Sequence, residues 1–197
     1  MQVGQLQRRE FITLLGATAT AWPLAARAQQ SRKIPRIGVL LSGTPASYST
    51  RVKVLLEGLR DHGYVEGRTI AIEWRWTQDN AERLPELAAE LVGLKLDAIV
   101  TGGTPAAKAL KGATQTTPII MAVIGDPVAV GLVDSLARPG GNATGFSIVA
   151  TDLSGKRLQL LKELIPGISL VAVMSNPTNP QSQIEFNETE IAAQALG

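Results

Sequence analysis

The fold of this chain is decided by the stretch Asp97-Ala98-Ile99-Val100-Thr101-Gly102-Gly103-Thr104-Pro105-Ala106. An apolar run ends at two glycines, and a threonine and a proline follow, which is the usual order of a buried strand, a tight loop and a helix start. The helical pattern continues to residue 113, and a second apolar run covers 118–123. Two strands and a helix joined by short loops predict a parallel βαβ unit, because parallel strands need a crossover between them.

The same alternation extends on both sides of this unit. We predict strands over 34–41, 69–76, 143–148 and 169–174, and helices over 47–62, 80–94, 105–113, 152–164 and from 179 to the end. The intervening stretch 125–141 is less regular. The pattern predicts an α/β fold with a parallel sheet and helices on both of its faces.

Pro and Gly residues gather at 138–143, and we interpret them as the passage between two lobes. The first lobe would cover 29–141 and be nearly whole, and the second would cover 142–197. A second unit of two strands and two helices cannot close a sheet of its own. We therefore expect the chain to stop partway through its second lobe.

Residues 1–28 are predicted to be a cleavable signal peptide. The basic pair Arg8-Arg9 precedes the apolar stretch 11–24, and Ala26-Arg27-Ala28 follows as a cleavage box. A membrane anchor is the alternative, but the stretch contains threonines and a proline and is short for a span, which needs about 20 apolar residues. We expect cleavage after Ala28 and a mature protein in the periplasm.

The export route and the charge follow from the same segment. The arginine pair resembles a twin-arginine signal, although Gln7 and Thr13 depart from that pattern. Cleavage would remove three arginines and one glutamate, so the net charge of +2 would fall to zero. The positive charge of the uncleaved chain therefore does not indicate nucleic-acid binding. The chain has no cysteine, which excludes disulfides and thiolate metal sites.

Candidate ligand contacts lie in the loops where strands lead into helices, because open parallel sheets bind ligands beyond the carboxyl ends of their strands. These loops are 42–45, 102–105, 125–127 and 176–180. The candidate residues in them are Ser42, Gly103, Thr104, Asp126, Asn176 and Asn179.

The loop before the 105–113 helix is the sharpest candidate. Its glycines permit close approach of a ligand to the backbone, and free N–H groups at the helix start would favour a carboxylate. Thr104 could offer its hydroxyl to the ligand or simply cap the helix. Asp126 could pair with an ammonium or cap a turn, and both asparagines could bind the ligand or form turns.

No catalytic constellation is apparent, so we expect neither an enzyme nor a metal or cofactor site. The only histidine, His62, lies at the end of a predicted helix, where surface capping is the default. Nucleophile-elbow, phosphate-loop and zinc-helix motifs are absent from the sequence. Trp74 and Trp76 lie two apart on a predicted strand and therefore on one face, where packing is the more common role.

Five motifs together resemble one family. They are Gly63-Tyr64-Val65-Glu66-Gly67-Arg68, Gly102-Gly103-Thr104-Pro105-Ala106, Gly125-Asp126-Pro127-Val128, Arg138-Pro139-Gly140-Gly141-Asn142-Ala143-Thr144-Gly145 and Asn176-Pro177-Thr178-Asn179-Pro180. The chain from about Ile34 to Gly197 is similar to ABC transporter substrate-binding proteins of the tryptophan/tyrosine-binding type. The resemblance implies a type 1 periplasmic-binding-protein fold, in which two lobes close on a small solute.

The resemblance also implies a role and a set of contacts. The protein would pass an amino acid or similar solute to an ABC permease in the inner membrane. The first lobe would contact the solute through the loops of Ser42, Thr104 and Asp126, and the second through Asn176 and Asn179. Two other classes stay open at this point: a ligand-sensing input module, which needs a signalling partner, and an exported α/β enzyme, for which no nucleophile and base pair is found.

Overall fold

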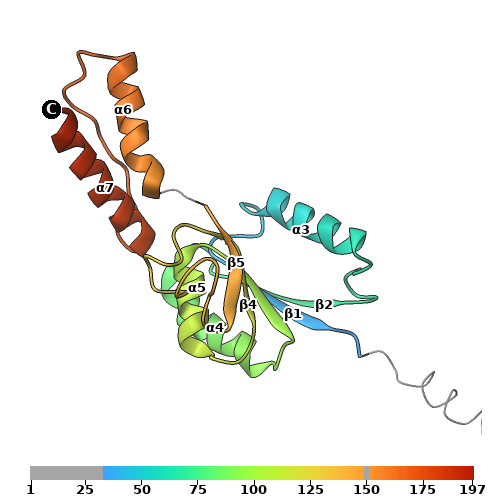
Figure 1. Ribbon diagram of the computed structural model, residues 1–197. Coiled ribbons are helices and arrows are strands. Elements are labelled where there is room, and N and C mark those ends of the chain that lie inside the picture. The colour runs from blue at the N-terminus through green and yellow to red at the C-terminus, as the bar shows by residue number, and fades with distance from the viewer. Residues whose placement is uncertain (1–32, 149–150) are drawn as a thin grey trace, which may run out of the picture. The chain divides into compact units, whose positions relative to one another are not determined.

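Five parallel strands form one sheet in the order β2-β1-β3-β4-β5 (Figure 1). They are β1 Arg36–Leu41, β2 Ala71–Trp76, β3 Ala98–Gly102, β4 Ile119–Ile124 and β5 Ala143–Ser147. The structure is a computed structural model and describes residues 33–148 and 151–197, so the predicted signal peptide lies outside the described residues. The parallel sheet confirms the predicted α/β class.

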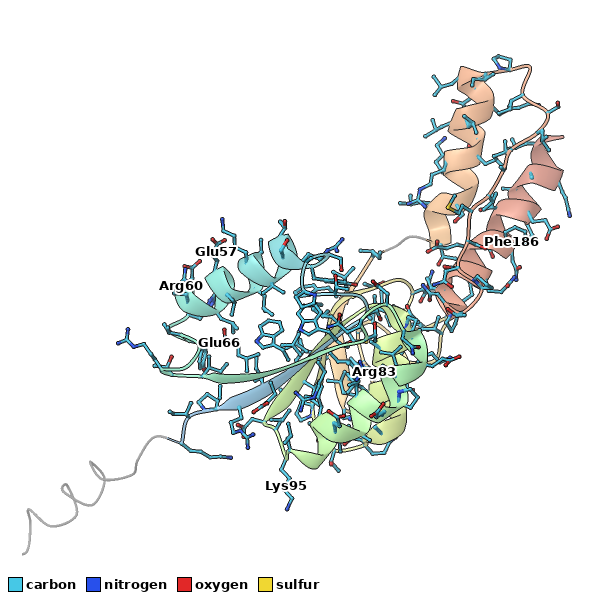
Figure 2. All side chains as sticks on the ribbon, turned by 180° about the vertical axis from the view of Figure 1, so that it is seen from behind. Glu57, Arg60, Glu66, Arg83, Lys95 and Phe186 are labelled. Carbon is cyan, nitrogen blue, oxygen red and sulfur yellow. The ribbon has the colours of Figure 1, made fainter. Side chains whose placement is uncertain are left out.

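Helices connect the strands as the sequence pattern predicts. They are α3 Ser49–Asp61, α4 Leu84–Gly93, α5 Thr104–Ala113, α6 Ser154–Leu164 and α7 Pro180–Leu196, with single 3-10 turns at Ala81–Arg83 and Thr151–Leu153. Helix α3 lies on one side of the sheet, and α4 and α5 lie on the other (Figure 1). Figure 2 shows the same layers from behind, with Glu57 and Arg60 on α3 and Lys95 on the opposite side.

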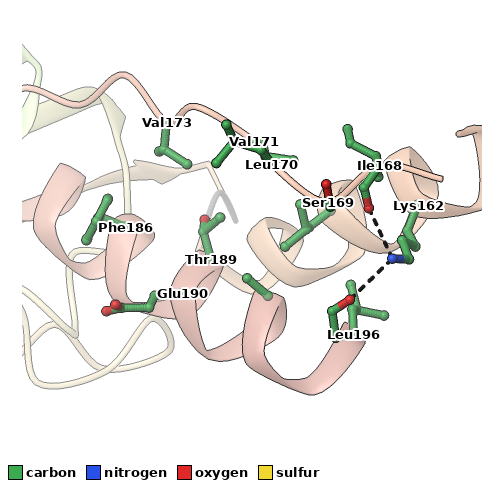
Figure 3. Close-up of a pocket in the computed structure, with 13 residues that line it drawn as sticks. Lys162, Ile168, Ser169, Leu170, Val171, Val173, Phe186, Thr189, Glu190 and Leu196 are labelled. Carbon is green, nitrogen blue, oxygen red and sulfur yellow. Dashed lines mark hydrogen bonds between the residues drawn. The ribbon is translucent and has the colours of Figure 1, made fainter. Parts of the chain in front are cut away.

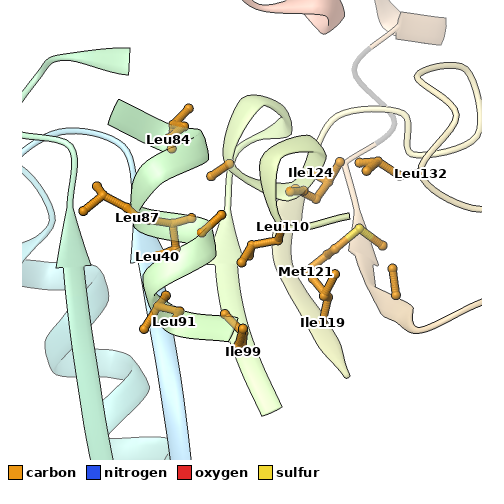
Figure 4. Close-up of a cluster of buried hydrophobic side chains, with 14 of the residues drawn as sticks. Leu40, Leu84, Leu87, Leu91, Ile99, Leu110, Ile119, Met121, Ile124 and Leu132 are labelled. Carbon is orange, nitrogen blue, oxygen red and sulfur yellow. The ribbon is translucent and has the colours of Figure 1, made fainter. Parts of the chain in front are cut away.

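The hydrophobic core lies between the sheet and the pair α4 and α5 (Figure 4). Leu40, Ile99 and Ile119 come from the strands, and Leu91 and Leu110 come from the helices; all are fully buried. The buried positions of α4 recur every three or four residues, which is why the helix presents one apolar stripe to the sheet. This layer fixes the carboxyl ends of the strands in place.

The opposite face of the sheet is covered more loosely. None of the side chains of α3 is buried, although the helix carries apolar residues at helical spacing. Beneath it, the Trp74 and Trp76 rings stack with centroids 5.8 Å apart, and Tyr48 lies 6.0 Å from Trp76. The tryptophans therefore pack against each other and against Tyr48, as expected for a structural pair.

Strand β5 pairs in parallel with β4, so residues 143–147 lie in the same sheet as β1 to β4. One predicted feature differs from the structure. The predicted strand 169–174 is wrong, because the segment has no strand neighbour among the described residues and a ladder needs a partner. Its Leu170 and Met174 are 87% and 101% exposed. None of the helices in the described ranges is long and apolar enough to cross a membrane.

Candidate solute site at the carboxyl ends of β1, β3 and β4

A cavity of about 650 Å³ opens at the carboxyl ends of the central strands. The chain leaves β1 toward β2 on one side and continues through β3 on the other, so the topological switch point lies between β1 and β3. Switch points are where open α/β sheets bind ligands. Leu41 and Thr101 form part of the floor, and the first turn of α7 contributes Asn179 and Gln181.

The start of α5 faces this cavity through Gly103 and Thr104. Gly103 has φ 90°, a left-handed conformation that favours glycine, and its N–H donates to the Val123 carbonyl at 2.9 Å. No side chain caps this helix, and Pro105 has no N–H, so the donors here are the amides of Thr104 and Ala106. Such a helix start favours an anionic group.

Thr104 is a buried residue, 2% exposed, whose hydroxyl has no hydrogen-bond partner in the described part of the chain. Because no fully buried side-chain oxygen within residues 33–148 and 151–197 lacks a partner, the hydroxyl oxygen itself is not fully buried. Neighbouring Thr101 differs, because its hydroxyl donates to the Leu40 carbonyl at 2.9 Å. Thr104 is therefore one of the hydroxyls of this wall that are available to a ligand.

Asp126 lies in the loop after β4 and caps the turn that follows it. Its Oδ1 accepts from the N–H groups of Val128 and Ala129, both at 3.0 Å. It is not among the residues that line the cavity, and the same is true of Ser42 at the end of β1. A ligand contact for either residue stays a prediction.

The two asparagines also act in turns. Asn179 Oδ1 accepts from the Gln181 N–H at 3.1 Å and so caps the start of α7. Asn176 Oδ1 accepts from the N–H of Thr178 at 3.0 Å and from its hydroxyl at 2.8 Å. Asn179 lines the cavity, whereas Asn176 does not.

Gln181 is a site residue that sequence reasoning missed. It is 4% exposed, and its Oε1 accepts from the Asp126 N–H at 2.8 Å. Its Nε2 donates to Thr151 Oγ1 at 2.7 Å and to Glu185 Oε1 at 3.1 Å. A side chain on Gly125 would collide with this amide. A glutamine in a first helical turn usually faces solvent, so only its i, i+4 relation to Glu185 could have drawn attention to it.

The cavity wall carries one side chain of each charge, Arg51 and Glu185. The Arg51 guanidinium lies over the Tyr48 ring, 5.2 Å from its centroid, in a cation–π contact. The remaining wall is largely apolar, with Val39 and Val100 from the strands. This arrangement suits a small solute with an apolar body and polar ends.

A smaller cavity of about 350 Å³ lies between α6, the extended segment 168–173 and α7 (Figure 3). Its one lysine is already engaged, because Lys162 Nζ donates to the carbonyls of Ile168 at 3.1 Å and Gly197 at 3.3 Å. Apolar groups such as Leu170 and Phe186 supply much of the rest. It has the composition of an incompletely filled core and not of a polar ligand site.

Among residues 33–148 and 151–197, no group of three or more His, Cys, Asp or Glu residues could hold a metal ion. His62 ends α3, with its Nδ1 2.9 Å from the Gly58 carbonyl oxygen, which is the expected capping position.

A parallel sheet with a cavity at its switch point defines a ligand-binding α/β protein. Residues 36–197 match the family described as ABC transporter substrate binding protein. The chain belongs to this family, as its motifs predict. It is 35% identical over 158 residues to the "Tyrosine-binding protein" of Clostridioides difficile, a match that covers 80% of this chain and 45% of the relative.

Solved structures agree with this assignment. A conserved domain protein from Vibrio cholerae matches with a TM-score of 0.75 and 29% identity, over 83% of this chain and 54% of the other. The ABC domain from Streptococcus pneumoniae in complex with L-Trp matches with a TM-score of 0.71, 29% identity and the same coverage, 83% and 54%. These neighbours confirm the expected type 1 periplasmic-binding-protein fold. The chain spans about half the length of the relatives that it matches.

Proposed function

We propose that this protein is the solute-binding component of an ABC importer that binds an amino acid or a similar small solute. The solute would occupy the cavity at the ends of β1, β3 and β4 and pass to a permease in the inner membrane. Family membership supports the class of protein, and the relatives described as binding tyrosine and L-Trp support an amino acid. The switch-point cavity supports the location.

The observation that carries the proposal is the start of α5. The unused hydroxyl of Thr104 and the uncapped amides behind it are preset for a carboxylate. The apolar floor below them would take the side chain of the solute.

The proposed location of the working protein is the periplasm. It rests on the predicted signal peptide, 1–28, with its twin-arginine character, and on the location typical of the family. Of the predicted lobes, we propose that the first contains the whole five-stranded sheet and that the second begins after β5.

Thermal unfolding with each amino acid in turn tests the proposal. A solute present at about 100 times its Kd raises the free energy of unfolding by about 2.7 kcal/mol. We expect at least one amino acid to raise the melting temperature. Thr104→Val, which keeps the shape but removes the hydroxyl, should weaken its binding about tenfold or more. Thr116→Val, an exposed change away from the cavity, is the matched control and should leave binding unaltered. No stabilisation by any amino acid would contradict the proposal.

A further inference from the structure

We propose that Glu185 is the group that binds the ammonium of the solute, and that Gln181 positions it. The inference rests on the proposed function, since it concerns the polar contacts of the same cavity. It assigns the cationic end of the solute to the first turns of α7 instead of to the loop of Asp126.

The placement of the two carboxylates favours Glu185. Among the residues that line the cavity, Glu185 is the one acidic side chain, and Asp126 is not in the lining. Asp126 directs its Oδ1 to two backbone amides of its own turn. Glu185 is half-buried, and only its Oε1 has a hydrogen-bond partner within the described ranges, which leaves Oε2 free for a ligand.

Gln181 holds the Glu185 carboxylate in a set orientation. Its Nε2 donates to Glu185 Oε1 at 3.1 Å and to Thr151 Oγ1 at 2.7 Å, while its Oε1 accepts from the Asp126 N–H at 2.8 Å. The amide is buried and lies against Gly125, where no side chain would fit. Because the amide of Gln181 makes these three hydrogen bonds, its side chain cannot rotate away from Glu185 without losing them. It is thus a positioning residue.

Two polar parts of the cavity lining then complement the carboxylate and the ammonium of a zwitterion. The start of α5 supplies N–H and hydroxyl donors for a carboxylate, and Glu185 supplies an acceptor for an ammonium. A charge-assisted hydrogen bond of this kind discriminates between a solute that has the ammonium and one that lacks it. The inferred ligand class is therefore a primary amino acid with an apolar or aromatic side chain, and desamino acids should bind more weakly.

Calorimetric titration with two ligand pairs tests the assignment. The pairs are L-tyrosine with 3-(4-hydroxyphenyl)propionate, and L-tryptophan with indole-3-propionate; the second member of each lacks the ammonium. The unaltered protein should prefer the amino acid by about tenfold or more. Glu185→Gln keeps the size of the side chain and removes its charge, so this preference should largely disappear.

Glu188→Gln is the matched control, because it makes the same carboxylate-to-amide change at an exposed residue of α7 that does not line the cavity. It should retain the full preference for the amino acid. Glu185→Asp keeps the charge but withdraws it by one methylene, and should keep part of the preference; it also serves if Glu185→Gln does not fold.

The outcomes separate the inference from the proposed function. Amino-acid binding with a preference that survives Glu185→Gln, or that disappears in the control Glu188→Gln or in Asp126→Asn, the alternative contact, would overturn the inference and leave the proposed function standing. Full preference in Glu185→Asp, if only that variant folds, would likewise overturn it. Failure of the unaltered protein to bind either amino acid would contradict both.

Discussion

Residues 36–147 and 151–197 have the same alternation of apolar runs and amphipathic helices. The two regions differ in how far their apolar side chains are buried. In the first region, five strands pair and α4 and α5 close a core over them. In the second, α6 and α7 form, but the apolar segment 169–174 between them pairs with no strand in the described part of the chain. A helix satisfies its own backbone, whereas a strand depends on its neighbours, and so only the helices of the second region match the prediction.

The largest expected effect of this difference is on the free energy of unfolding that is lost when a leucine side chain is truncated to alanine. Leu110 lies in the core beneath α5 and is fully buried, whereas Leu170 in the unpaired segment is 87% exposed. Leu110→Ala should lower the free energy of unfolding by about 3 kcal/mol, because it removes buried methyl groups and leaves a cavity. Leu170→Ala should change it by less than about 0.5 kcal/mol. Urea unfolding of both variants measures the contrast, and equal losses would contradict it.

A smaller difference in stability is expected between alanine substitutions at two glycines, one in each region. Gly145 on β5 has φ 147°, and a Cβ there would collide with the Met121 carbonyl of β4. Gly145→Ala should therefore cost about 2 kcal/mol of stability by straining the backbone and forcing the strands apart. Gly167, just before the unpaired segment, has open space around it, so Gly167→Ala should be nearly neutral. Melting temperatures report both; a well-tolerated Gly145→Ala would show that β5 is not held against β4.

Much of the fold could be predicted because the local signals agree with one another. The apolar residues 98–100, the turn glycines and Pro105 together indicate one strand, one loop and one helix, and β3 and α5 lie there. The partner of the strand that follows the Pro/Gly turn near 141 could not be predicted, because such a turn looks the same whether the next strand joins the existing sheet or begins a new one. Strand partners are a property of the whole chain.

Only part of the site could be predicted, because local sequence patterns locate its loop residues but not its helix residues. The loops that follow the strands do bring Gly103, Thr104 and Asn179 to one cavity, as the rule for parallel sheets requires. Gln181 and Glu185 were missed because they lie inside a helix, where polar side chains usually face water. Only the close approach of α7 to Gly125, which no local pattern encodes, brings them to the cavity.

Hydrogen exchange of the protein with and without L-tyrosine tests the central claim most directly, because it distinguishes the two cavities along the chain. If the solute binds at the ends of β1, β3 and β4, amides at 103, 104, 106, 107 and 181–185 should exchange more slowly when it is present. Those of the segment 169–174, which contributes Ser169, Leu170, Val171 and Val173 to the smaller cavity, should exchange rapidly in both states. Protection confined to 169–174 and to α6, with none at the start of α5, would contradict the account.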